Sequence, residues 1–116
     1  MKLTLNIDIN QLLKMKQFSR DSSDYKTASF YLGRFTEKLI VLFQQKGYRS
    51  EGTLTSLTKA TYLLRKENIS AQISQILVKE PLTALLQITA EKEEFLEIRA
   101  LLESIDIPST AISYVH

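Results

Sequence analysis

Residues 3–9 read Leu-Thr-Leu-Asn-Ile-Asp-Ile, a strict alternation of apolar and polar side chains. Successive side chains of a β-strand point to opposite faces of its sheet, so this period of two predicts a strand with one buried face. We predict that the strand covers residues 2–9. Its buried side chains would be Leu3, Leu5, Ile7 and Ile9.

Two helices are predicted after this strand. Asn10 can cap a short one over residues 11–19. A longer helix begins in the cluster Ser22-Ser23-Asp24, in which Asp24 is the expected N-cap, and it ends before Gly47, since glycine readily takes the left-handed conformation found just past a helix C-terminus. Apolar residues at spacings of 4, 3, 4 and 3 form its core stripe: Ala28, Leu32, Phe35, Leu39 and Leu42.

A third helix is predicted over residues 53–67, and Asn68 would close it. Basic side chains at Lys59, Arg65 and Lys66 would lie away from its apolar face. That face would contain Leu54, Leu57, Ala60, Thr61 and Leu64.

Residues 71–89 allow two interpretations. One is a β-hairpin of Ala71–Val78 and Leu82–Thr89 that turns at Pro81, a residue suited to the second position of a type I turn. The other is a helix that ends before Pro81. Periodicity does not separate the two in so short a segment. We favour the hairpin because a helical pattern and another β-prone segment come after it in the chain.

After Thr89 the pattern indicates a helix and a short strand. Three glutamates between residues 91 and 94 lie where the first helical turn favours negative charge. Pro108 ends the helix, and Ala111–Val115 is β-prone. The apolar stripe of this helix would be Phe95, Ile98, Leu102 and Ile105.

These elements predict one α+β domain over residues 1–116, with a small sheet and helices on one face. A helix between two strands is a β–α–β unit, and the full order then resembles a ferredoxin-like βαββαβ fold with an enlarged helical first crossover. The alternative is a mainly α protein in which residues 2–9 and 111–115 form a two-stranded sheet and residues 71–104 are helical.

The composition argues against catalysis. The chain has 116 residues with no cysteine, and its single histidine is His116. Thiolate metal sites, cysteine nucleophiles and histidine-based triads are therefore excluded, and the three scattered glycines build no phosphate-binding loop. The glutamates of residues 91–97 fit a solvated helix face. We expect no enzyme, no cofactor, no metal and no small-molecule substrate.

Hydropathy predicts a cytoplasmic protein with no membrane attachment. The longest purely apolar run covers residues 39–43, far short of the ~20 residues that cross a bilayer. Polar residues interrupt the first ten positions, which is not the pattern of a secretory signal.

Charge is strongly polarised along the chain. Residues 1–79 contain 13 basic and 6 acidic side chains, a net +7, whereas residues 80–116 contain 2 and 7, a net −5. Basic segments with interspersed aromatics suit a phosphate backbone. Opposite charges could equally attract two copies of the chain to each other.

The leading functional prediction is a small protein–protein interaction or regulatory module of the inhibitor, immunity, adaptor or assembly-subunit type. Its candidate surface lies on the long helix and contains Phe30, Tyr31, Arg34 and Lys38. A homodimer is also expected, formed through a sheet edge within residues 71–89 or 111–115. The alternative is DNA or RNA binding by a basic helical half, residues 10–79, with contacts from Lys14, Lys16, Arg20, Lys26, Arg49, Lys59, Arg65 and Lys66.

Overall fold

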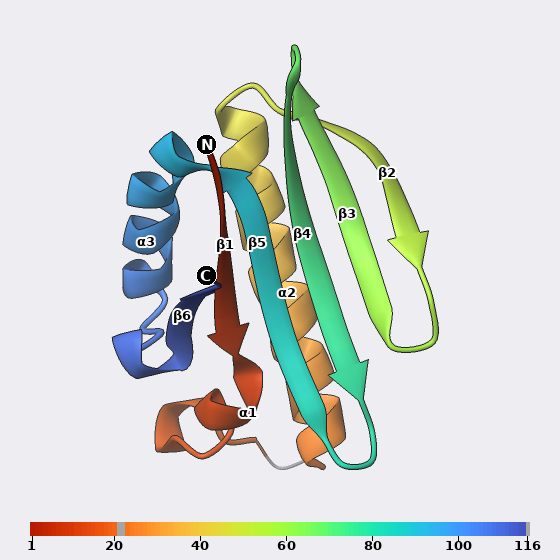
Figure 1. The fold of residues 1–116 in the computed structure, drawn as a ribbon. Helices are drawn as coiled ribbons and strands as arrows, with labels where there is room; N and C mark the ends of the chain where they lie inside the picture. Colours follow the sequence, from red (N-terminus) through yellow and green to blue (C-terminus); the bar gives the residue numbers. More distant parts are fainter. Residues whose placement is uncertain (21–22, 116) are drawn as a thin grey trace.

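The computed structural model describes residues 1–20 and 23–115. Within them the chain forms a six-stranded antiparallel sheet with three α-helices (Figure 1). The strands are β1 (Lys2–Asp8), β2 (Arg49–Thr55), β3 (Lys59–Lys66), β4 (Ile69–Val78), β5 (Thr83–Glu91) and β6 (Ile112–Val115). The helices are α1 (Ile9–Leu12), α2 (Asp24–Gln45) and α3 (Phe95–Ser104). Across the sheet the strand order is β2-β3-β4-β5-β1-β6.

This architecture corrects both predicted topologies. The sheet has six strands, not the four of a ferredoxin-like βαββαβ fold or the two of the mainly α alternative. Residues 53–67, predicted as a helix, belong to β2, the connecting turn and β3. Their leucines match a helical spacing, but the segment is rich in threonine, which favours strands. Pairing decided the outcome, since β3 is hydrogen-bonded along its whole length to β4.

Tight hairpins connect β3, β4 and β5. Asn68 does not close a helix: it comes after Glu67, which has a φ of 56°, in the turn between β3 and β4. Positive φ values are typical of the short turns that join antiparallel strands. The predicted hairpin in residues 71–89 is confirmed, with a register from Gln72 opposite Thr89 to Val78 opposite Thr83.

Strand β1 lies between β5 and β6 and places its alternating apolar side chains in the core. Leu5 and Ile7 are fully buried. The strand ends at Asp8, one residue earlier than predicted, because the Asp8 carboxylate accepts a hydrogen bond from the Gln11 backbone N–H at 3.3 Å and caps α1. Ile9 is therefore the first residue of α1, although its side chain is buried as expected.

Asn10, predicted as a helix cap, instead holds the end of the β4–β5 hairpin against α1. Its Nδ2 donates to the Leu82 carbonyl at 2.9 Å, and its Oδ1 accepts from the Ala84 N–H at 2.5 Å. A side chain far away in the sequence thus satisfies two backbone groups near the start of β5.

Helix α2 has its cap one residue earlier than predicted. The Ser23 hydroxyl is the cap and accepts from the Lys26 N–H at 3.3 Å, while Asp24 is the first helical residue; Ser22 lies outside the described residues. Gly47, with a φ of 98°, comes just after the C-terminus as expected. Leu42, predicted in the core stripe, is only half-buried, whereas its neighbour Phe43 is fully buried in the core.

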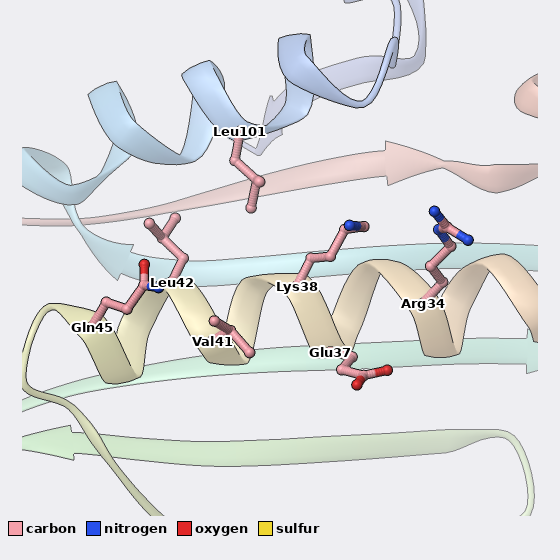
Figure 2. Close-up of a pocket in the computed structure, with 7 residues that line it drawn as sticks. All are labelled: Arg34, Glu37, Lys38, Val41, Leu42, Gln45 and Leu101. Carbon is pink, nitrogen blue, oxygen red and sulfur yellow. The ribbon is translucent and has the colours of Figure 1, made fainter.

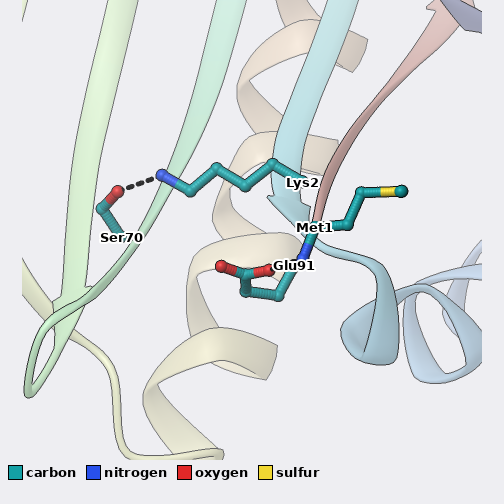
Figure 3. A network of polar contacts seen from close by, with 4 residues as sticks. All are labelled: Met1, Lys2, Ser70 and Glu91. Carbon is teal, nitrogen blue, oxygen red and sulfur yellow. Dashed lines mark hydrogen bonds and ion pairs between the residues drawn. The ribbon is translucent and has the colours of Figure 1, made fainter.

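Helices α2 and α3 lie side by side on one face of the sheet (Figure 2). Among the described elements, no helix covers the opposite face (Figure 1). On that face the Lys2 ammonium donates to the Ser70 hydroxyl across β5, and the N-terminal ammonium pairs with Glu91 at 2.9 Å (Figure 3). Polar contacts therefore connect strands on this uncovered face of the sheet.

The edges of the sheet are β2 and β6. Residues 71–89 form no edge, contrary to prediction, because β3 pairs with β4. The predicted edge at residues 111–115 is confirmed in β6. All seven residues of β2 are exposed, so this strand extends beyond the helix layer.

A polar cluster joins the end of α2 to the start of α3. The Lys46 ammonium lies 3.0 Å from Glu94 Oε1 and 2.8 Å from Glu97 Oε1. Glu94 also accepts a hydrogen bond from the buried Tyr48 hydroxyl, whose ring packs edge-on against Phe43 at 5.0 Å. These contacts fix the position of α3 along α2.

The free energy of unfolding is expected to fall as the pH rises above about 10, which is the ordinary pKa of a tyrosine side chain. Burial and the hydrogen bond to Glu94 raise the pKa of Tyr48. A group whose pKa is higher in the folded protein than in the unfolded chain stabilises the fold fully at pH values below its unfolded-state pKa. This stabilisation is lost as the pH rises towards and through its folded-state pKa. Burial lowers the pKa of Lys46, but hydrogen bonds to Glu97 and Glu94 outweigh this effect, so the pKa is raised overall. Deprotonation of Lys46 at high pH therefore also reduces the stability of the protein.

Urea midpoints measured between about pH 8 and about pH 11 would test this expectation. The wild-type midpoint should decline, and the Tyr48→Phe midpoint should decline less steeply, because the variant has no phenol to ionise at this position. Equal declines in the two proteins would contradict a contribution from Tyr48.

Candidate functional site

A groove runs between α2 and α3 on the outer side of the helix layer. One part has a volume of about 520 Å³, and its lining includes Val41, Leu42 and Leu101 (Figure 2). The adjoining part, of about 550 Å³, extends along α2 to the end of α3. Arg34 and Lys38 line both parts, so the two cavities form one continuous groove, named here the α2–α3 groove.

Helical spacing places the α2 side of this groove on a single stripe. Arg34, Lys38, Val41 and Gln45 succeed one another at spacings of 4, 3 and 4, which keeps them on one side of a helix. Arg34 and Lys38 point towards the α3 side, and Leu101 points back from α3 towards Leu42 (Figure 2). Val41 is 45% exposed, so the stripe presents apolar surface beside its two cations.

Aromatic rings form the other end of the groove. Phe30 is 39% exposed, and the Arg20 guanidinium carbon lies 3.9 Å from its ring centroid. The Phe30 ring meets Tyr31 edge-on at 5.1 Å, and Tyr31 stacks on the buried Phe35 at 5.5 Å. The exposed ring is thus anchored through a chain of ring contacts that reaches the core.

The groove is richer in unpaired cations than in acids. Arg20, Arg34 and Lys38 form no ion pair with any residue in the described part of the chain. Glu37 lines the same groove but points away from α3 (Figure 2). Among the described lining residues, Asp106, just past α3, is the other acid. A ligand that combines negative charge with apolar surface would complement this arrangement.

No protein-family model, curated protein or solved structure matches the chain. The geometry of the α2–α3 groove is therefore the feature from which a function can be inferred.

The four residues predicted as an interaction surface lie together in this groove. The part of the groove with a volume of about 550 Å³ is lined by all four: Phe30, Tyr31, Arg34 and Lys38. Sequence reasoning missed Val41 and Leu101, although Val41 continues the spacing of Arg34 and Lys38 by three residues. Leu101 had no comparable signal, because its neighbour across the groove is nearly sixty positions away in the sequence.

The residues predicted for nucleic-acid binding are dispersed over the molecule. Lys14 and Lys16 follow α1, which comes directly after β1. Arg49 is on β2, the edge strand three strands away from β5 and four from β1 (Figure 1). The Arg65 guanidinium pairs with Glu51 at 2.7 Å. Residues 10–79 were predicted to be a basic helical half, but from residue 49 onwards they form the strands β2, β3 and β4. The remaining candidates are Arg20 in the groove, Lys26 on α2, and Lys59 and Lys66 at the two ends of β3.

Other chemistry has little geometric basis. In residues 1–20 and 23–115, no three acidic or histidine side chains are grouped as metal ligands would be. Three of the four glutamates of residues 91–97 contact cations: Glu91 pairs with the N-terminus, and Glu94 and Glu97 pair with Lys46. His116 lies outside the described residues. None of the helices described has the length and apolar character needed to cross a membrane.

Proposed function

We propose that the protein is a non-enzymatic interaction module whose α2–α3 groove binds an acidic, partly apolar segment of a partner protein. The observation that carries the proposal is the grouping, in one groove, of exposed apolar side chains with cations that have no ion-pair partner among the residues that the structure describes. Arg34 and Lys38 would meet the acidic groups, and Phe30 and Val41 would be covered by apolar ones. We place this module in the cytoplasm as part of the same proposal.

The shape of the groove favours a polypeptide over a small molecule. From Phe30 to Gln45 the stripe spans fifteen residues of helix, about 22 Å at 1.5 Å per residue. Both parts of the groove are open along this length, so a segment several turns long could lie in it. An amphipathic helix laid into a groove is a common mode of peptide recognition.

The charges near the groove favour a protein over a nucleic acid. Glu37 and Asp106 line the groove, and Glu97 and Glu103 lie on the adjacent helix. A regularly charged phosphate backbone would meet these carboxylates as well as the cations, which costs free energy. A protein segment can place a few acids opposite the cations and apolar groups elsewhere.

Selection from a displayed peptide library would test the proposal. The library is first depleted on the double variant Arg34→Glu/Lys38→Glu and then selected on the wild-type protein. We expect enriched peptides to combine acidic and large apolar residues, because only these satisfy both components of the groove. Binding of synthetic versions, measured by fluorescence anisotropy, should weaken by about tenfold or more in the double variant.

The matched control is Lys59→Glu, which reverses an exposed charge at the start of β3, away from the groove. It should leave peptide binding unchanged. Enrichment of basic or uncharged peptides, or equal binding to the double variant, would contradict the proposal. Tight binding of a single-stranded oligonucleotide that weakens steeply with salt would favour the nucleic-acid alternative instead.

A further inference from the structure

The outer side of α3 carries an acidic and apolar stripe. Leu96, Ala100 and Glu103 of α3 succeed one another at spacings of 4 and 3, Glu93 comes just before the helix, and all four are exposed. Leu96 is 82% exposed, an unusually high value for a large apolar side chain on a helix. This stripe has the composition that the α2–α3 groove would complement.

The two stripes can overlap along most of the α3 helix. From Arg34 to Gln45 the α2 stripe covers about 16 Å, and from Leu96 to Glu103 the stripe on α3 covers about 10 Å at the helical rise of 1.5 Å per residue. Each has a charged end and an apolar middle, with Val41 on α2 and Leu96 and Ala100 on α3.

Contacts within the monomer fix how the two helices are aligned. At one end, Lys46 after α2 pairs with Glu94 and Glu97 at the start of α3. At the other end, Arg34 lines the same cavity as Ser104, the last residue of α3. The helices therefore run antiparallel, with the cationic half of α2 level with the C-terminal turn of α3.

A twofold axis parallel to the helices would superpose these complementary stripes. Rotation about such an axis keeps every residue at its level along the helices and exchanges the lateral positions of α2 and α3. Arg34 of one copy would then come within reach of Glu103 of the second copy, and Val41 would lie opposite Ala100. A twofold axis perpendicular to the helices would instead place α2 against α2 and leave Arg34 and Glu103 without opposite charges across the interface.

We propose that a second copy of this chain occupies the α2–α3 groove through the outer stripe of its α3 helix. This inference rests on the proposed function and names the partner of that site. The contact is isologous, so each Arg34–Glu103 pair occurs twice in the dimer and both grooves are filled. The net charges of +7 for residues 1–79 and −5 for residues 80–116 favour the same association.

Charge exchange at Arg34 and Glu103 tests the proposal in the full-length protein. At about 100 µM protein and about 50 mM salt, light scattering should give twice the 13.3 kDa mass of the chain for the wild type. Arg34→Glu and Glu103→Arg should each give the monomer mass, because each places like charges opposite one another. The double variant Arg34→Glu/Glu103→Arg should restore the dimer, and the control Lys59→Glu should remain dimeric.

Two outcomes would overturn the proposal: a monomeric wild type under these conditions, or single variants that dissociate without restoration in the double variant. Circular dichroism of each variant checks that these exposed substitutions leave the fold intact. If the wild type is monomeric but acidic apolar peptides bind in an Arg34-dependent manner, this inference is wrong and the proposed function stands. If neither the dimer nor peptide binding is observed, both are wrong.

Discussion

Replacing Ile7 with aspartate is expected to remove a large part of the protein's stability. Ile7 is 0% exposed and lies near the C-terminal end of β1, between β5 and β6. The variant would bury a carboxylate among apolar side chains. We expect the free energy of unfolding to fall by about 4–5 kcal/mol, which is at the upper end of the range for single substitutions. Domains of this size are stable by only about 5–15 kcal/mol, so the melting temperature should fall by tens of degrees or the transition should disappear.

Thr4→Asp is the matched control, because it introduces the same side chain into the same strand on the opposite face. Thr4 is half-buried there and shares a hydrogen bond of 2.9 Å with Thr89. The carboxylate would remain near water, so we expect a loss of about 1 kcal/mol or less. Similar melting curves for the two variants would show that the two faces of β1 are not differently buried.

Truncating Phe43 to alanine should cost about 3–5 kcal/mol in the free energy of unfolding. The side chain is fully buried near the end of α2, and its ring packs against Tyr48. Removing the ring leaves a cavity and loosens the connection between α2 and the Lys46 cluster that positions α3. Denaturant unfolding monitored by far-ultraviolet circular dichroism would measure the loss.

Phe30→Ala provides the comparison within the same helix. Its ring is partly exposed at the groove, so the stability loss should be about 1 kcal/mol or less. Binding of the selected acidic peptides should weaken, because Phe30 supplies apolar surface to the groove. A stability loss as large as that of Phe43→Ala would mean that Phe30 belongs to the core rather than to a binding surface.

Several elements could be predicted because a local pattern was sufficient. The alternation in residues 3–9 identified β1, and the stripe from Ala28 to Leu39 identified α2, since each period matches only one regular backbone. The hairpin of residues 71–89 and the terminal helix and strand were also correct. Phe30 and Tyr31 of the α2–α3 groove could be found because they precede Leu32, and three consecutive positions on a helix cannot all face the core.

Residues 53–67 were assigned to a helix because leucine and alanine recur there at helical spacing. The same side chains also fit strands, and in β2 that pattern is uninformative because all seven residues are exposed. No buried face exists there to impose a period of two. The prediction of a four-stranded ferredoxin-like sheet failed at this point, since the two unrecognised strands, β2 and β3, make the sheet six-stranded.

The sequence by itself determined the strand β1, the limits and buried face of α2, and the polarity of charge between the two parts of the chain. These properties depend on side-chain period, capping and composition, all of which are local. Only the tertiary structure decided that residues 49–66 pair as strands, that Asn10 holds the start of β5, and that Leu101 faces Leu42 across a groove. Each of these depends on hydrogen bonds or packing between residues far apart in the chain, whose energies no local pattern encodes.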